Sequence, residues 1–215
     1  MTNLPPVKKV VAGSNHTLVL TEGGTVFGWG SNSNLQLSHQ KEFATVENPL
    51  LAVFHPIKFE MNISDNSVED MSAGDEFSIL VTRSKTNDET EVYGCGHNIH
   101  GELGVGFLKH VSDLVKIDSL SNYKIKTDDG EKDIRIKEIS CGNNHCMALL
   151  SIGVVMEWGA NEYGQLGNKK RVFSENPLIV NNFAKENVLS VSCGHNNSAV
   201  ITENNLKKEG SETKK

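Results

Sequence analysis

Short apolar runs separated by glycine-containing turns recur along the whole chain. The clearest examples form two groups, at residues 7–11, 17–20 and 25–27 and at residues 136–140, 147–150 and 154–158. These runs contain the β-branched and aromatic residues that are typical of short strands. No window of helical length shows an apolar stripe with the period of an α-helix. The pattern therefore predicts an all-β protein.

Two short phrases alternate along these runs. One places a glycine after Trp29, Cys95 or Trp158, with an asparagine two residues later and then a Gly-x-Leu-Gly unit or a degenerate form of it. The other places a glycine three residues before a histidine, as in Gly13 and His16. The recurring residues are Gly13, His16, Trp29, Gly30, Asn32, Gly74, Gly96, Asn98, Gly101, Leu103, Gly104, Gly142, His145, Trp158, Gly159, Asn161, Gly164, Gln165, Leu166, Gly167 and Gly194. Because they return from repeat to repeat, we expect them to be structural rather than catalytic.

The spacing of the phrases sets the size of the repeat. Gly30, Gly96 and Gly159 lie 66 and 63 residues apart. A unit of about fifty residues with insertions fits propeller blades better than the shorter helical repeats. The predicted organisation is an extension at residues 1–6, one repeat domain over 7–202 and a polar tail at 203–215. The units of that domain are 7–67, 68–134, 135–187 and a partial unit at 188–202.

The repeated residues suggest physical roles inside a blade. Gly30 and Gly159 allow the chain to turn, or to pass a neighbouring backbone, where a side chain would clash. The repeated asparagines suit a turn because their amides bond nearby backbone groups. We expect the leucines of the Gly-x-Leu-Gly units to fill space between blades. His16 and His145 are expected to bond a backbone group in a recurring turn.

The combined motif resembles the regulator of chromosome condensation repeat family. Its best copy runs from Trp158 to Gly167 and follows a Cys-Gly-x-x-His phrase at residues 141–145. The resemblance extends from about residue 7 to residue 201 and implies a β-propeller, typically of seven blades, that acts mainly through protein binding. Some members promote nucleotide exchange on small GTPases. Others serve as chromatin, ubiquitin-ligase, ciliary or mitochondrial modules.

Some positions depart from the family pattern. Leu35 and Ser38 stand where the family has glycines, and the second repeat differs at Cys95, Glu76 and Phe77. We expect these departures to loosen the local geometry without changing the fold. The predicted fold is an all-β propeller of this type, an incomplete ring of about three to four blades.

The length of the chain raises the question of ring closure. Seven blades of about fifty residues need roughly 350 residues, whereas the 215 residues here hold three repeats and a half. Both ends offer the same half of a repeat, and open blades expose strand edges that tend to pair with other chains. Two explanations stay open. The sequence is a portion of a longer propeller, which we favour, or its arc is completed by another chain.

The charge balance argues against a nucleic-acid partner. The formal net charge is −6 and the isoelectric point is near 5.8, whereas nucleic-acid binding favours a basic face. No run of about eighteen apolar residues indicates a membrane-spanning helix, and residues 1–6 lack a signal or transit pattern. We expect an intracellular, reducing compartment, cytoplasmic or mitochondrial rather than chromatin-bound.

Catalytic and metal-binding patterns are weak. A zinc set of Cys141, His145, Cys193 and His195 lacks the short Cys-x-x-Cys spacing. No Walker loop, nucleophile elbow or paired-histidine metal helix is present. The prediction is therefore a non-enzyme with no catalytic residues, no metal and no cofactor.

Function is expected in the segments that are unique to single repeats. Residues 54–63 suggest an outer strand of a blade and residues 84–91 a polar hairpin tip. Residues 118–133 contain an Asp-Gly turn that predicts a protruding β-hairpin. The candidate partner contacts there are Tyr123, Asp128, Asp129, Glu131 and Lys132. In this interpretation the tyrosine anchors a protein and the acidic tip steers its approach, while a functionless loop is the alternative.

Two functions remain open. The first is a non-catalytic protein-interaction module or scaffold. The second is a guanine-nucleotide exchange factor for a small GTPase, which needs a rigid wedge that loosens the bound nucleotide and its metal. The sequence identifies no residue set that would form such a wedge.

Overall fold

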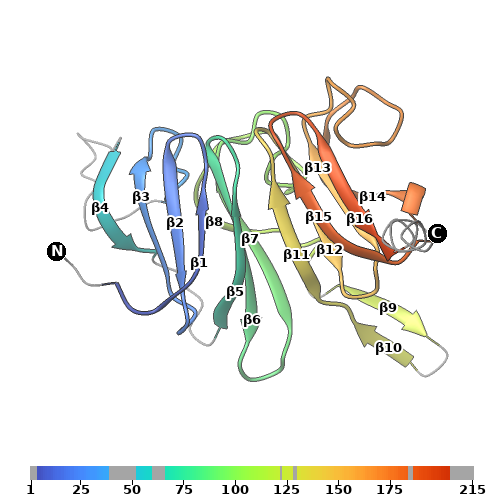
Figure 1. Ribbon diagram of the computed structural model, residues 1–215, viewed down its shortest axis with the longest axis horizontal. Helices are drawn as coiled ribbons and strands as arrows, with labels where there is room; N and C mark the ends of the chain where they lie inside the picture. Colours follow the sequence, from blue (N-terminus) through green and yellow to red (C-terminus); the bar gives the residue numbers. More distant parts are fainter. Residues whose placement is uncertain are drawn as a thin grey trace, which may run out of the picture.

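The protein is an arc of propeller blades. The computed structural model describes residues 4–38, 52–59, 66–121, 123–127, 130–183 and 186–203. These residues form three four-stranded antiparallel sheets that stand side by side, a two-stranded half-blade beside the third sheet, and a separate two-stranded hairpin (Figure 1). The prediction of an all-β propeller arc is confirmed.

Consecutive strands are neighbours within each sheet. Blade 1 consists of β1 (Val7–Ala12), β2 (His16–Thr21), β3 (Val26–Ser31) and β4 (Ala52–Lys58). Blade 2 consists of β5 (Asn66–Ala73), β6 (Phe77–Ser84), β7 (Thr90–Gly96) and β8 (Val111–Lys116). Blade 3 consists of β11 (Ile136–Cys141), β12 (His145–Leu150), β13 (Val155–Gly159) and β14 (Ser174–Ile179). The half-blade consists of β15 (Val188–Cys193) and β16 (Ser198–Thr202).

The first strands of the blades contact one another along the inside of the arc, β1 against β5, β5 against β11 and β11 against β15. Hydrogen bonds to serine side chains join these strands at equivalent positions. The N–H of Cys141 donates to Ser72 Oγ, and the N–H of Cys193 donates to Ser140 Oγ, both at 2.9 Å. The repeat therefore specifies the contact between blades as well as the sheet within each blade.

The core lies between the blades, where the leucines of the Gly-x-Leu-Gly units are inserted. Leu37, Leu103 and Leu166 are at most 1 % exposed. The strands make room for them with glycine, because a Cβ added at Gly28 would lie 2.9 Å from Leu37 Cδ2 and one at Gly94 would lie 3.0 Å from Leu103 Cδ2. The expected packing role of these leucines is confirmed.

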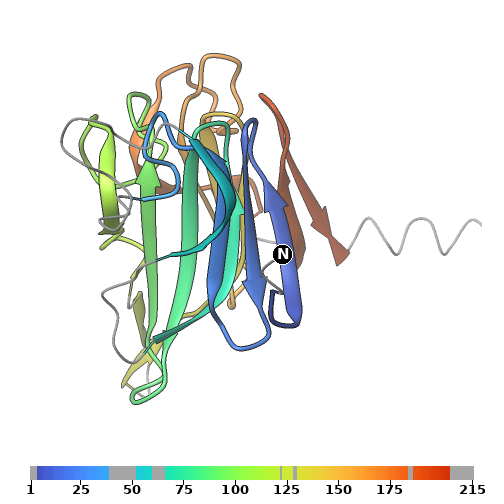
Figure 2. The same cartoon turned by 90° about the vertical axis from the view of Figure 1, so that its left-hand side faces the viewer.

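The strands of the blades end at two opposite ends of the molecule, and these ends differ. One of them, which we call the loop face, carries the turns at residues 13–15, 74–76, 142–144 and 194–197 and the loops at 97–110 and 160–173. Backbone bonds join turn and loop in each blade, such as His97 N–H to Glu76 O at 3.0 Å and Ala160 N–H to Asn144 O at 2.7 Å. The strands of the blades run between the loop face and the opposite end (Figure 2).

The opposite end carries the tight hairpins and the predicted insertion. β9 (Lys124–Thr127) and β10 (Gly130–Asp133) pair antiparallel and project beyond blade 3 (Figure 1). The predictions of a hairpin here and of a hairpin turn after Ser84 are confirmed, with the return strand of the first hairpin at 130–133. The outer strand predicted over 54–63 is confirmed as far as β4 extends, and residues 60–63 lie outside the described part of the chain. A 3₁₀ turn spans Asn181–Phe183. Among the described residues, no helix is long and apolar enough to cross a membrane.

Candidate functional site

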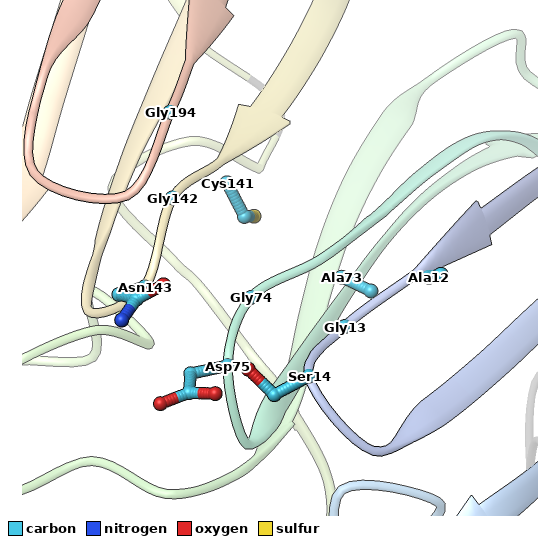
Figure 3. A pocket seen from close by; sticks show the side chains of 10 residues that line it. All are labelled: Ala12, Gly13, Ser14, Ala73, Gly74, Asp75, Cys141, Gly142, Asn143 and Gly194. Atoms are coloured by element: carbon cyan, nitrogen blue, oxygen red, sulfur yellow. The ribbon is translucent and has the colours of Figure 1, made fainter.

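The turns of the loop face meet around the axis of the arc. The N–H of Ser14 donates to the carbonyl of Asp75 at 3.2 Å, that of Asp75 to Asn143 at 3.0 Å, and that of Asn143 to His195 at 3.2 Å. Each turn therefore bonds the same position of the next blade. The side chains of Ser14, Asp75 and Asn143 surround a hollow of about 180 Å³ at this mouth (Figure 3). Because the backbone carries the bonds, this position tolerates different side chains.

His16 and His145 make the same contact between blades. The Nε2 atom of His16 lies 3.1 Å from Ser78 Oγ, and the Ser78 hydroxyl donates to the carbonyl of Gln36 at 2.6 Å. The imidazole therefore donates its Nε2 hydrogen to the serine. His145 repeats the geometry with Ser198, also at 3.1 Å. The sequence predicts a backbone partner in a recurring turn. The ring nitrogens bond a hydroxyl of the next blade, and the backbone of the same phrase in that blade, at Phe77 for His16 and at Asn197 for His145, also acts on the rings.

Both histidines are neutral packing residues at neutral pH. Burial lowers the pKa of His16 and of His145 to about 4, and backbone contacts that act in the opposite direction do not offset it. Each ring lies over the glycine of its own phrase, since a Cβ on Gly13 would be 2.3 Å from His16 Cε1. The structural role predicted for this phrase is confirmed.

Blade 2 replaces this polar pair with an apolar one. Phe77 takes the position of the histidine, and Cys146 takes the position of the facing serine in blade 3. Both side chains are fully buried in one hydrophobic cluster. Burial also raises the pKa of the Cys146 thiol well above its ordinary value. Both positions of this contact between blades 2 and 3 are therefore apolar, and the interface stays buried.

The first repeat keeps the shape of its loop without glycines. Leu35 and Ser38 both have φ of 64°, close to the 81° and 68° of Gly101 and Gly104. The expectation that these departures loosen the loop is wrong. A non-glycine residue in this left-handed region costs roughly 1–2 kcal/mol, so the loop stores strain.

The repeated asparagines and glycines behave as predicted. Asn98 Oδ1 accepts the N–H of Leu103 at 2.9 Å, and Asn161 Oδ1 accepts that of Leu166 at 3.0 Å. Gly159 has φ of 95°, and a Cβ there would lie 2.4 Å from the carbonyl oxygen of Asn144. Glycine is required because the chain passes a neighbouring backbone.

A cluster of His97, His100 and Glu102, called here the His–Glu cluster, is built only in the loop of blade 2. Glu102 Oε1 lies 2.7 Å from His97 Nδ1 and 3.0 Å from His100 Nδ1. The hydrogen bond to Glu102 raises the pKa of His97. Burial raises the pKa of Glu102, but bonds from His97, its own backbone and His100 outweigh burial, so the net pKa is lowered.

The sequence reasoning missed this cluster. Within the described part of the chain, His97, His100 and Glu102 are the group that brings three potential metal ligands within 4.8 Å of one another, and the cysteine–histidine set considered from the sequence is not such a group. The available signal was Glu102 at the glutamine position of the Gly-Gln-Leu-Gly unit, with two histidines just before it.

Glu157 is a second unusual carboxylate. It stands in β13 at the position that Gly28 and Gly94 occupy in the other blades, is 3 % exposed, and its Oε2 has no hydrogen-bond partner among the described residues. Burial raises its pKa to about 7. With Phe183 and Val200 it lines a hollow of about 300 Å³ between blade 3 and the half-blade.

The predicted partner contacts lie at the end opposite the loop face. Tyr123 is half-buried against the core, and its carbonyl accepts the N–H of Ile134 at 2.7 Å. Glu131 is exposed on β10. Lys132 belongs to the same strand by its backbone, while Asp128 and Asp129 lie outside the described residues. A contact role for these residues stays a prediction.

Comparison with known proteins identifies the repeats. Two family models, each described as a regulator of chromosome condensation (RCC1) repeat, match residues 7–36 and 136–165 in one case and 23–81, 89–149 and 153–201 in the other. The chain is 30 % identical over 202 residues to the ultraviolet-B receptor UVR8 of Arabidopsis thaliana, covering 93 % of this chain and 40 % of that protein. It is also 30 % identical over 200 residues to the probable E3 ubiquitin-protein ligase HERC6 of Homo sapiens, covering 92 % and 17 %.

A solved structure agrees with the fold. Prp20p of Saccharomyces cerevisiae matches with a TM-score of 0.65 at 21 % identity, over 98 % of this chain and 48 % of that one. The chain thus spans less than half the length of each of these proteins. The matched models cover most of its residues, and the chain belongs to the regulator of chromosome condensation (RCC1) repeat family.

Proposed function

We propose that this chain is a protein-interaction module that binds a partner through its loop face. The observation that carries the proposal is a gathering of exposed apolar side chains on the two long loops of that face. They are Ile99, Phe107, Leu108, Tyr163, Val172 and Phe173, each at least 42 % exposed. Exposed apolar patches rimmed by polar residues are typical of interaction sites.

The loop of blade 2 lies against the outer strand of blade 3, β14, which follows the second loop. The N–H of Gly106 donates to the carbonyl of Glu175 at 2.8 Å, at the start of the strand that follows the second loop. A Cβ on Gly101 would lie 2.6 Å from the Cα of Glu175. This contact supports a single surface formed by blades 2 and 3. The polar turns around the hollow belong to the same face.

The different roles of the repeated positions and the variable loop positions support the same proposal. The repeated residues are buried between blades, as Trp158 and Leu166 illustrate. The loop positions beside them differ between blades, with Asn34, His100 and Tyr163 at equivalent places. A partner that touches the loop face therefore contacts residues particular to this chain. The scaffold itself has no catalytic role in this proposal.

The relatives support binding as the general activity without naming the partner. The Prp20p structure is described together with its binding properties to Gsp1p and histones. HERC6 is named as a probable ubiquitin ligase, a name that describes a protein of which this chain spans 17 %. We place this chain in the cytoplasm or mitochondrion and treat its partner as a protein. Exchange-factor activity on a small GTPase is the second candidate, supported by the family resemblance alone.

The test compares matched surface variants. A partner is captured with the wild-type chain, identified and purified, and its affinity is measured by calorimetry. Replacing Tyr163 and Phe173 with aspartate is expected to weaken binding about 30-fold, as for the loss of a hot spot of about 2 kcal/mol. Phe54→Asp is the control, because Phe54 is 94 % exposed on β4, the outer strand of blade 1, and does not belong to the loops of blades 2 and 3.

A third variant exchanges the charges of Glu131 and Lys132 on the hairpin. Loss of binding in the hairpin variant alone would show that the partner binds the hairpin. Unchanged binding in all three variants would contradict a binding role for either surface. The second candidate is measured with the same proteins, as release of labelled GDP from a panel of small GTPases. Release that the wild-type chain accelerates and the loop variant does not would favour exchange activity.

A further inference from the structure

We propose that His97, His100 and Glu102 form a binding site for a divalent transition metal, with Zn²⁺ as the ion that best suits the ligands. Two imidazole nitrogens and one carboxylate oxygen are ligands that zinc accepts, and three protein ligands with an open fourth position are typical of sites that keep a water molecule. The proposal does not depend on the protein-interaction function.

The ligand atoms already lie close to the required arrangement. Zinc bonds of about 2.0–2.1 Å in a tetrahedral site place neighbouring ligand atoms about 3.3 Å apart. The two observed separations, from Glu102 Oε1 to His97 Nδ1 and to His100 Nδ1, are 2.7 and 3.0 Å. All three ligand atoms lie within 4.8 Å of one another. An expansion of a few tenths of an ångström brings these two separations to the tetrahedral value.

The glutamate is not needed for the fold of the loop. In blades 1 and 3 the equivalent residues are Gln36 and Gln165, whose Oε1 atoms accept a loop N–H at 3.0 Å. Glu102 does the same with Oε2, which accepts the N–H of His100 at 2.8 Å. Its second oxygen, Oε1, is the one that both histidine rings approach. The replacement thus adds an anionic ligand to a loop that glutamine already supports.

The residues that hold these ligands are fixed by the scaffold. The N–H of His97 donates to the carbonyl of Glu76 at 3.0 Å, and the carbonyl of Glu102 accepts Trp158 Nε1–H at 2.8 Å. The Glu102 side chain is fully buried, while the His100 side chain is 34 % exposed. The site therefore has rigid support on one side and an opening to solvent on the other.

The surroundings favour a cation. The negative charges of Glu76 and Asp75 act on His97. The exposed ring of His110 lies edge-on to His97, with centroids 4.7 Å apart. The open coordination position lies on the loop face, where water can fill it.

The experiment titrates Zn²⁺ into the purified chain carrying no histidine tag, followed by calorimetry and by the zinc-dependent shift in Tm. We expect one equivalent to bind and to raise Tm, and Co²⁺ to give the absorption of a tetrahedral site. Glu102→Gln introduces the residue of the other two blades and should weaken binding at least about 100-fold, since even supporting residues of metal sites cost 10–100-fold. Without metal its Tm should match that of the wild type.

Two further variants keep the test decisive. His97→Ser with His100→Asn gives blade 2 the residues that blade 1 has at Ser31 and Asn34, and should abolish binding even if Glu102→Gln folds poorly. Gln36→Glu supplies a carboxylate to blade 1, where Ser31 and Asn34 stand in place of the two histidines, and should not create a second site. Absence of zinc binding by the wild type, or binding that survives loss of both histidines, would overturn the proposal.

Discussion

The Nε2 atom of His16 lies 3.1 Å from the hydroxyl of Ser78, although the two residues are 62 positions apart and belong to different blades. The same pair recurs two interfaces further on as His145 and Ser198. Phe77 and Cys146 take these positions at the interface between them. At each interface, one residue of a blade therefore contacts a matching residue of the next blade.

Acid should weaken the folded state through these histidines. Their pKa in the folded protein is about 4, below the ordinary value of 6.5, so the unfolded chain binds the proton more readily between these pH values. The stability they provide is complete above pH 6.5 and is lost as the pH falls through 4. Each histidine should contribute about 3 kcal/mol of that loss. Urea unfolding at a series of pH values measures it.

The matched variant is His16→Phe, because Phe77 already fills this position in blade 2. It should reduce the loss of unfolding free energy between pH 7 and pH 4 relative to the wild type. Since Ser78 keeps its bond to the Gln36 carbonyl, the variant should still fold at pH 7. An acid dependence identical to that of the wild type would show that His16 is not buried as a neutral ring.

Glu157 should act in the opposite direction. Its pKa of about 7 lies above the ordinary 4.5, so the folded protein holds this proton more tightly than the unfolded chain does. The stabilisation is complete below pH 4.5 and is lost as the pH rises through 7. Glu157→Gln should therefore gain about 3 kcal/mol over the wild type on going from pH 4.5 to pH 8. Unfolding curves for both proteins at these pH values test it, and a gain independent of pH would contradict a buried carboxyl group.

Gly159→Ala should be strongly destabilising. The added Cβ would lie 2.4 Å from the carbonyl oxygen of Asn144, and φ at this residue is 95°. Gly153→Ala is the control, because φ is 81° there and nothing lies within 4 Å of the added atom. The control should cost about 1 kcal/mol for the backbone alone, and Gly159→Ala at least twice that. Thermal unfolding separates the two, and equal costs would mean that the close backbone approach is absent.

Ser38→Gly should stabilise the protein. The residue holds φ of 64°, where the other two loops have glycine. Relief of roughly 1–2 kcal/mol of strain exceeds the extra chain entropy that glycine loses on folding, which is about 0.5–1 kcal/mol. A net gain of about 0.5–1 kcal/mol is expected in urea unfolding. Ser33→Gly, at an exposed position of the same loop without positive φ, should give no gain.

Much of the fold follows from local pattern. The paired phrases around Trp29 and Trp158, with their spacing, are sufficient for the blades and for the half-blade, and the Asp-Gly turn predicts the hairpin at β9 and β10. The roles of Gly159 and Asn161 follow as well, because both act on backbone of their own blade. Two expectations failed. The partner of His16 lies one repeat away, where no local pattern identifies it. Leu35 keeps a left-handed backbone like that of Gly101, which its residue type alone does not predict.

The sequence by itself determined that the chain is an arc of RCC1-type blades, because repeated short-range signals specify strands, turns and buried positions without reference to the rest of the molecule. Only the tertiary structure decided which residues particular to a single repeat lie close together. Glu102 and the two histidines are common residue types in a loop, and they become a candidate metal site because the loop geometry points three ligand atoms at one place. The proposed surface spans two loops because adjacent blades bring the loop of blade 2 against the strand that follows the loop of blade 3.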